Sequence, residues 1–159
     1  MDKRKVEGSG VFAVIYGPSK TGKSTATGAA GAAGLFLAQP GGLLPIKNYL
    51  GLDGIEYLMP NNVQEAAKIV RENAGKHSSI VIDDFSLLTE QTIQQLEKKH
   101  SFGEMWRALR HQVLEMRDAA RAATAKGTHV IFNCHQSPPK TSSGKYVRGG
   151  PQLPGQLPE

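Results

Sequence analysis

The chain has 159 residues, of which 39% are hydrophobic and 21% charged, which allows one folded domain and argues against a disordered chain. The 19 Lys and Arg residues outnumber the 14 Asp and Glu residues, and this balance suits a polyanionic partner or simply a soluble surface. A single cysteine, Cys134, excludes an intramolecular disulfide and is expected to be a small buried side chain. The sequence has no signal-peptide pattern and no apolar run long enough to span a bilayer, so we expect a cytoplasmic protein without membrane contact.

Taken in chain order, the elements predict an α/β fold. Short apolar runs predict strands at residues 11–16, 35–38, 79–82 and 129–133. Helix patterns and caps predict helices at residues 23–33, 61–74, 90–99 and 104–126. We expect a flexible N-terminus at 1–10, an irregular excursion with a short strand or turn at 43–60, and a Pro/Gly-rich loop or tail at 137–159. The alternation predicts a single domain, 1–159, with a mostly parallel sheet flanked by helices on both faces.

The longest predicted helix, 104–126, has an apolar face and a basic face. Its apolar side chains recur at spacings of three and four and are expected to lie in the core: Trp106, Leu109, Val113, Met116, Ala120 and Ala123. Four arginines are on the opposite face: Arg107, Arg110, Arg117 and Arg121.

A glycine-rich loop follows the first predicted strand and matches the phosphate-binding pattern G-x-x-x-x-G-K-[ST]. The glycines allow the backbone to curl so that its N–H groups face phosphate oxygens, and the helix that follows presents its positive dipole end to the same anion. Lys23 is expected to reach the β- and γ-phosphates of ATP, and Ser24 to bind Mg²⁺. The predicted nucleotide-binding residues are Gly17, Pro18, Ser19, Lys20, Thr21, Gly22, Lys23, Ser24 and Thr25.

Two acids end the third predicted strand, at the position where a phosphate-binding loop needs a carboxylate for its metal ion. Asp83 is the expected Mg²⁺ partner of Ser24. Asp84 has two interpretations: it either orients or deprotonates the attacking water, or it caps the segment that begins with Phe85.

The fourth predicted strand ends in polar residues that could detect the γ-phosphate. Asn133, His135 and Gln136 are the candidates, and His135 has a second interpretation, as a cap of the strand. The five histidines have no metal-ligand spacing, so no zinc site is expected.

In the order of these motifs, together with Trp106 and the segment 149–155, the chain resembles phage-encoded RecA-like P-loop ATPases of the AAA type, some of which are single-strand annealing or recombination factors. The resemblance implies a RecA-like fold, ATP and Mg²⁺ as cofactors, phosphate and Mg²⁺ binding by Lys23, Ser24 and Asp83, and a sensor-like role for His135. Together with Asp84, whose role comes from its position after the strand, Lys23 and His135 are the expected catalytic residues. It also implies a role on single-stranded DNA in recombination or replication, self-association, and contact with a single-strand-binding protein. Lys140, Lys145 and Arg148 would contact DNA, or one of them, Arg148 first, would reach a neighbouring subunit's nucleotide.

The sequence departs from this family where an acidic catalytic residue usually follows the second strand, because Gln39 is found there. Unless Asp84 or Glu56 substitutes, hydrolysis is expected to be slow or to depend on DNA or on a neighbouring subunit. Two other functions therefore stay open: a nucleotide-gated assembly or packaging factor with little hydrolysis, and a small-molecule kinase.

Overall fold

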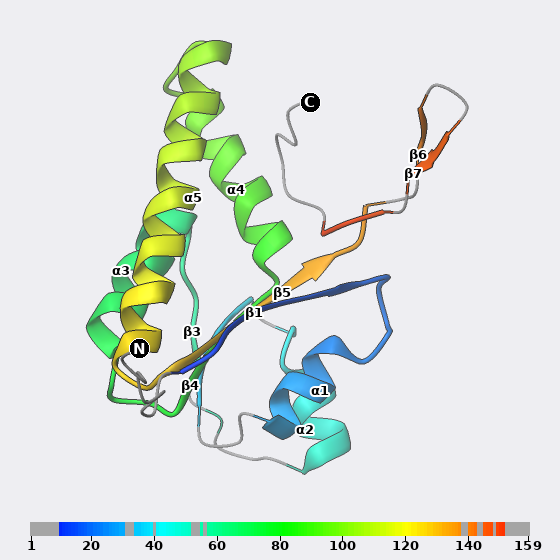
Figure 1. Ribbon diagram of the computed structural model, residues 1–159, viewed down its shortest axis with the longest axis vertical. Helices are drawn as coiled ribbons and strands as arrows, with labels where there is room; N and C mark the ends of the chain where they lie inside the picture. Colours follow the sequence, from blue (N-terminus) through cyan, green and yellow to red (C-terminus); the bar gives the residue numbers. More distant parts are fainter. Residues whose placement is uncertain are drawn as a thin grey trace, which may run out of the picture.

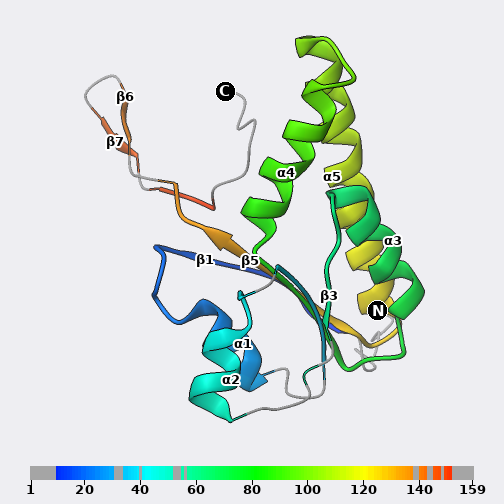
Figure 2. The same cartoon turned by 180° about the vertical axis from the view of Figure 1, so that it is seen from behind.

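Five parallel strands form the sheet at the centre of the fold, in the order β1-β5-β4-β2-β3. The computed structural model describes residues 10–30, 34–39, 41–51, 55, 57–137, 140–142, 145–147 and 149–151. Helices cover both faces of the sheet, with α1 and α2 on one side and α3, α4 and α5 on the other (Figures 1 and 2). The predicted α/β class with a parallel sheet between two helical layers is therefore confirmed.

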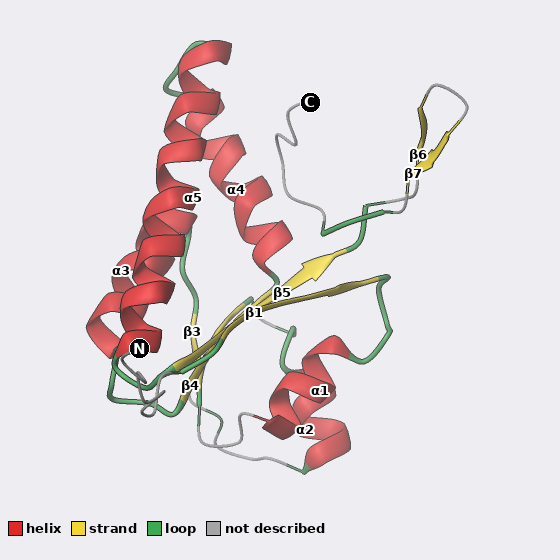
Figure 3. Ribbon diagram, viewed as in Figure 1, coloured by secondary structure: helices red, strands yellow, loops and turns green. Residues whose placement is uncertain are grey.

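The elements alternate along the chain, as Figure 3 shows. The sheet strands are β1 (Phe12–Gly17), β2 (Leu35–Ala38), β3 (Tyr57–Leu58), β4 (Ser79–Asp83) and β5 (His129–His135). The helices are α1 (Lys23–Ala30), α2 (Leu44–Leu50), α3 (Val63–Asn73), α4 (Phe85–Glu97) and α5 (Phe102–Ala125). A hairpin of β6 (Lys140–Ser142) and β7 (Lys145–Val147) follows β5.

Side-chain alternation along the strands separates two cores. Ile80 and Ile82 of β4 belong to the large cluster under α3 and α5, whereas Val81 packs with Ile46 of α2 on the other face. Asp83 is two residues beyond Val81, so the pleat places it on the same face as α1 and α2. The strand that the sequence predicted to end in an acid thus presents that acid to the glycine-rich loop.

The position of β5 between β1 and β4 brings the predicted site residues to one edge. Gly17 is in register with His135, and Ile82 with Phe132, so the carboxyl ends of the three strands lie together. In parallel α/β sheets this edge is where ligands bind.

Two of the predicted helices, α3 and α5, begin at capping side chains. Asn62 accepts a hydrogen bond from the Glu65 amide (2.8 Å), and Glu65 accepts one in return from the amide of Asn61 (2.8 Å). Ser101 and Glu104 form a capping box at the start of α5. The buried residues of α5 include Leu109, Met116, Ala120 and Ala123 of the predicted stripe, while Trp106 and Val113 are partly buried at its edge.

Three predictions about local structure were wrong. Residues 44–50 form helix α2 rather than an irregular segment, and α4 begins at Phe85 rather than near Glu90. The segment after β5 is not only loop, since it contains the β6–β7 hairpin. The predicted N-terminal tail at 1–9, the helix end at 31–33 and the last residues, 152–159, lie outside the described part of the chain.

The base of this hairpin is tied to the end of β5. Gln136 forms an antiparallel bridge with Pro151, and the Ser137 amide donates to the carbonyl oxygen of Gly150 (2.9 Å). A Cβ atom on Gly149 would lie 1.9 Å from the Ser137 carbonyl oxygen, so only glycine fits there. The backbone amide of Gln136 also donates to the carbonyl oxygen of Gly17 (3.1 Å), which joins the base of the hairpin to the glycine-rich loop.

In the described part of the chain, no helix combines the length and the hydrophobicity needed to cross a lipid bilayer.

Candidate functional site

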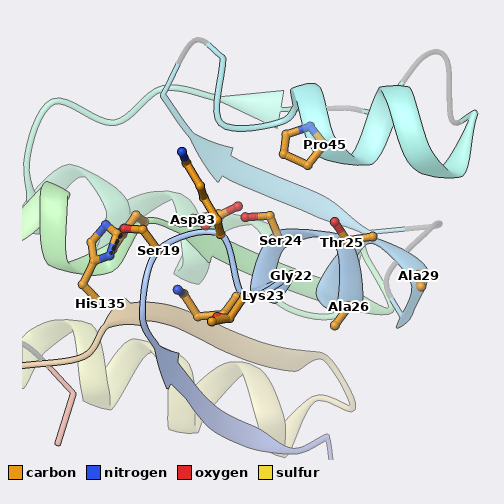
Figure 4. A pocket seen from close by; sticks show the side chains of 13 residues that line it. Ser19, Gly22, Lys23, Ser24, Thr25, Ala26, Ala29, Pro45, Asp83 and His135 are labelled. Carbon is orange, nitrogen blue, oxygen red and sulfur yellow. Dashed lines mark hydrogen bonds and ion pairs between the residues drawn. The ribbon is translucent and has the colours of Figure 1, made fainter. Parts of the chain in front are cut away.

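A pocket of about 900 Å³ opens at the carboxyl edge of the sheet. Residues 19–25 form one wall, and Asp83, Asp84 and His135 from the ends of β4 and β5 form another (Figure 4). The structure thus brings together the predicted loop, the predicted metal ligand and two of the predicted catalytic residues, Asp84 and His135. The third, Lys23, is in the loop itself.

The loop between β1 and α1 has the curled backbone that the glycines predicted. Lys20 and Gly22 both have positive φ angles, 64° and 83°. At Gly17 an added Cβ would lie 3.2 Å from the Thr21 hydroxyl, which itself donates to the carbonyl oxygen of Pro18 (2.8 Å). Positive φ at alternating positions is typical of concave, anion-binding backbone, and α1 begins directly after the loop at Lys23.

The Lys23 ammonium spans this loop from the inside. It donates to the carbonyl oxygens of Gly17 (2.9 Å) and Pro18 (2.8 Å), and the side chain is half-buried. A positive charge is therefore held at the centre of the loop, beside the first turn of α1. This is the arrangement in which an ammonium group can exchange carbonyl oxygens for phosphate oxygens.

Asp83 lies opposite Ser24, and the two side chains point toward each other in Figure 4. Asp83 is 7% exposed, and its oxygen Oδ2 has no hydrogen-bond partner among the described residues. Burial raises the pKa of Asp83 above its ordinary value and the Asp84 charge adds to the rise, while hydrogen bonding with Ser24 and Asn133 and the charge of Lys23 oppose it. A buried carboxylate oxygen without a hydrogen-bond partner is stabilised when a cation binds to it.

These residues fit Mg²⁺ that arrives with a phosphate ligand. The described residues contain no group of three or more His, Cys, Asp or Glu side chains able to hold a metal ion alone. Mg²⁺ commonly takes only one or two protein oxygens and completes its shell with phosphate oxygens and water. The Ser24 hydroxyl and the free oxygen of Asp83 supply that number.

Asp84 and His135 connect the end of β4 to the loop. The Asp84 carboxylate caps α4 by accepting from the Ser86 amide (2.7 Å), as one of its two interpretations predicted. Its other oxygen, Oδ2, pairs with Nε2 of His135. The Nδ1 atom of His135 in turn lies 3.3 Å from the Ser19 hydroxyl. Asp84 thus caps α4 and also lines the pocket, and its catalytic role remains a prediction.

The other two candidates, Asn133 of β5 and Gln136 just after it, do not line the pocket. Asn133 is buried and donates to the Thr27 hydroxyl of α1 (3.0 Å), and Gln136 donates to the Gly149 carbonyl oxygen (3.3 Å). Of the three polar residues expected to detect the γ-phosphate, only His135 lines the pocket. Asn133 instead fixes the position of α1 relative to the sheet.

Cys134 is buried between these residues, as predicted. Burial raises the pKa of its thiol to about 11, so it stays protonated and unreactive at neutral pH.

Two residues near the pocket were missed by sequence reasoning. The Ser86 hydroxyl accepts the backbone amide of His135 (3.0 Å), and Pro45 of α2 lines the pocket opposite the loop. The Asp-x-Ser start of α4 was a visible signal for Ser86, because it is a helix-cap pattern. Pro45 had none, since α2 itself was not predicted.

The remaining candidates are outside the pocket as described. Gln39, at the position of the usual acid, donates to the Gln91 side chain (3.2 Å). The backbones of Lys140 and Lys145 lie in the β6–β7 hairpin. Their side chains, and all of Arg148 and Glu56, are outside the described part of the chain.

No protein-family model matches the chain, and no curated protein matches it either.

Proposed function

We propose that this chain binds ATP with Mg²⁺ in the pocket and hydrolyses it, as a RecA-like P-loop ATPase of phage origin. It acts in the host cytoplasm on single-stranded DNA, during recombination or replication. The observation that supports this most is the position of Lys23 and Ser24 on the first turn of α1, after a curled loop and facing Asp83. Lys23 and the loop bind the phosphate anion, and Ser24 and Asp83 bind the metal ion beside it.

The triphosphate is bound by the loop and the start of α1. Backbone N–H groups of the loop and the positive end of the α1 dipole attract the phosphates, and Lys23 releases the carbonyl oxygens of Gly17 and Pro18 to reach them. The sequence contains no Asn-Lys-x-Asp pattern for reading guanine, which favours ATP over GTP.

Ser24 and Asp83 hold the metal ion, which neutralises phosphate charge when it is bound. Asp83 is suited to this because its free oxygen is buried beside the Ser24 hydroxyl. Without the ion, the carboxylate is desolvated and incompletely paired.

For hydrolysis, Asp84 and His135 act on the attacking water. The water oxygen forms a bond to the γ-phosphorus, the bond to the β–γ bridging oxygen breaks, and ADP and inorganic phosphate leave. The proton of the water passes to the Asp84–His135 pair and then to solvent or to the released phosphate. Gln39 is bonded to Gln91, whereas the Asp84–His135 pair lines the pocket and lies beside Ser19 of the loop.

One observation favours a second function, a nucleotide-gated assembly or packaging factor. Both Asp84 oxygens are already engaged, one by the Ser86 amide and one by His135, and Gln39 supplies no acid. A site with these contacts binds ATP while turning it over slowly. No contact in the described residues specifically favours a small-molecule kinase.

The experiment is ATP hydrolysis by the purified protein with and without single-stranded DNA. Lys23→Ala should lower turnover by a factor on the order of 100, because one preorganised cation at the transferring phosphate is removed. Lys76→Ala, which changes an exposed lysine in the turn after α3, is the control and should retain full activity. Turnover that is unchanged in Lys23→Ala would refute the proposal. Tight ATP binding with no turnover under either condition would favour the assembly factor.

A further inference from the structure

The exposed side of α5 carries an arginine track, which we define as Arg107, Arg110, Arg117 and Arg121. The steps between them are three, seven and four residues, so the side chains fall on one side of the helix. At about 1.5 Å of rise per residue the track is about 21 Å long. Arg107, Arg110 and Arg121 are exposed, and Arg117 is partly buried.

The acids of α5 leave most of this track unneutralised. Glu104 is used in the capping box with Ser101, and Glu115 lies near His111 (3.8 Å). The backbone carbonyl oxygen of Glu115 accepts a hydrogen bond from the Arg71 side chain of α3, so the side of α5 that carries Glu115 faces α3. Asp118 pairs with Arg117 at 2.9 Å. In the described part of the chain no carboxylate lies within 4.0 Å of the other three arginine side chains.

A pair of aromatic side chains, of which Phe102 is exposed and Trp106 partly buried, lies at the end of the track that is far from the sheet. Phe102 is 77% exposed and packs edge-to-face on Trp106, with 6.0 Å between ring centroids. Lys98 and Lys99 precede it in the turn between α4 and α5, and both are exposed. This turn projects beyond the sheet in both views of the fold (Figures 1 and 2).

We propose that the arginine track, together with Phe102, binds single-stranded nucleic acid. A row of arginines matches the row of phosphates along one strand, since guanidinium groups bind phosphate oxygens in pairs. Phe102 offers a free ring on which an unpaired base can stack, and this combination of cations and an aromatic ring is typical of single-strand binding. This inference rests on the proposed function, in which single-stranded DNA is the partner. The binding surface is separate from the pocket, because α5 covers the face of the sheet opposite to α1.

The test is the binding of fluorescent oligothymidylate and oligouridylate by fluorescence anisotropy, without nucleotide, over a series of salt concentrations. The double variant Arg107→Gln/Arg110→Gln should bind about tenfold more weakly and lower the slope of log affinity against log salt by about 1.4, which is about 0.7 per lost phosphate contact. Phe102→Ala should weaken binding roughly fivefold or more and leave the salt slope unchanged, since it removes stacking and no charge.

The matched control is Lys68→Gln/Lys76→Gln, which removes the same charge from exposed positions on and just after α3 and should bind like the wild type. Thermal unfolding of all variants reports whether each is folded. Arginine variants that bind as tightly as the wild type would overturn the proposal, as would a wild type that binds only duplex or no nucleic acid. ATP turnover, measured separately, would still report on the pocket, so the two proposals can fail independently.

Discussion

Asp83→Asn should stabilise the folded protein at neutral pH while removing its response to Mg²⁺ and nucleotide. The Asp83 carboxylate is buried, and its Oδ2 atom has no hydrogen-bond partner. An unsatisfied buried polar group costs about 1–3 kcal/mol, and the hydrogen bonding with Ser24 and Asn133 offsets part of this. We expect a gain in unfolding free energy of about 1 kcal/mol, or about 2–4 °C in Tm for a chain of this size.

The direction of the pKa shift of Asp83 determines how the effect of this substitution on stability changes with pH. The folded pKa of Asp83 is raised above the ordinary value of 3.8 by burial, so the folded state holds its proton to higher pH than the unfolded state does. Wild-type stability therefore falls as the pH rises from 3.8 through the folded pKa, and the full penalty is present above it. The advantage of the asparagine should be greatest at neutral pH and should shrink as the pH is lowered toward 3.8.

The assay is thermal unfolding of both proteins across this pH range, with and without Mg²⁺ and ADP. Nucleotide at a hundredfold excess over its Kd should stabilise the wild type by about 2.7 kcal/mol, and the variant much less. Asp118→Asn, which changes an exposed carboxylate, is the control and should show neither effect. A variant that is less stable than the wild type at neutral pH would show that burial is not the dominant influence on Asp83.

Three further predictions concern single residues of the site. Gly22→Ala should destabilise the fold by about 1–2 kcal/mol and weaken ATP binding, because φ is 83° at this position; Gly103→Ala, a helical position where an added Cβ meets nothing, should not destabilise the fold and should leave ATP binding unchanged. Asp84→Asn should lower turnover by about 100-fold with little change in Tm, since asparagine still caps α4 but can no longer take a proton through His135. Cys134 should resist alkylation at neutral pH and react only on unfolding, because its thiol is buried with a pKa of about 11.

Each of these has an outcome that would contradict it. Gly22→Ala with normal ATP affinity would mean that the loop tolerates a side chain at positive φ. A large loss of Tm in Asp84→Asn would assign its effect to α4 rather than to catalysis. Rapid alkylation of native Cys134 would mean that β5 opens to solvent.

The elements that the sequence predicted best are those whose burial is complete. β2 and β4 are short runs of consecutive buried side chains, and such short runs favour strands inside a sheet that is covered on both faces. The curled backbone of the glycine-rich loop could be predicted for a different reason: the positive φ angle at Gly22 is one that glycine adopts without strain. For these segments local sequence and tertiary structure favour the same conformation.

The elements that were missed depend on contacts between distant residues. Helix α2 is seven residues long, too short to show a period, and it is held by Ile46, which is fully buried against Phe36 and Val81. Ile46 also packs closely on Gly28, where an added Cβ would lie 2.8 Å from it. The pairing of His135 with Asp84 could not be foreseen either, because it requires β5 to lie beside β4, and strand order is not encoded locally.

Because the base of the β6–β7 hairpin is closed, a change in the length of the hairpin does not alter the geometry of the pocket. The bridge between Gln136 and Pro151 and the close contact at Gly149 bring the two ends of this segment together, whatever lies between them. Once the ends of a loop are joined, doubling its length costs only about 0.6 kcal/mol in entropy. Insertions, deletions or whole replacements can therefore change what this arm contacts while Gln136 stays bonded to Gly17 and His135 keeps its place. New binding specificity can be acquired at this position without rebuilding the pocket.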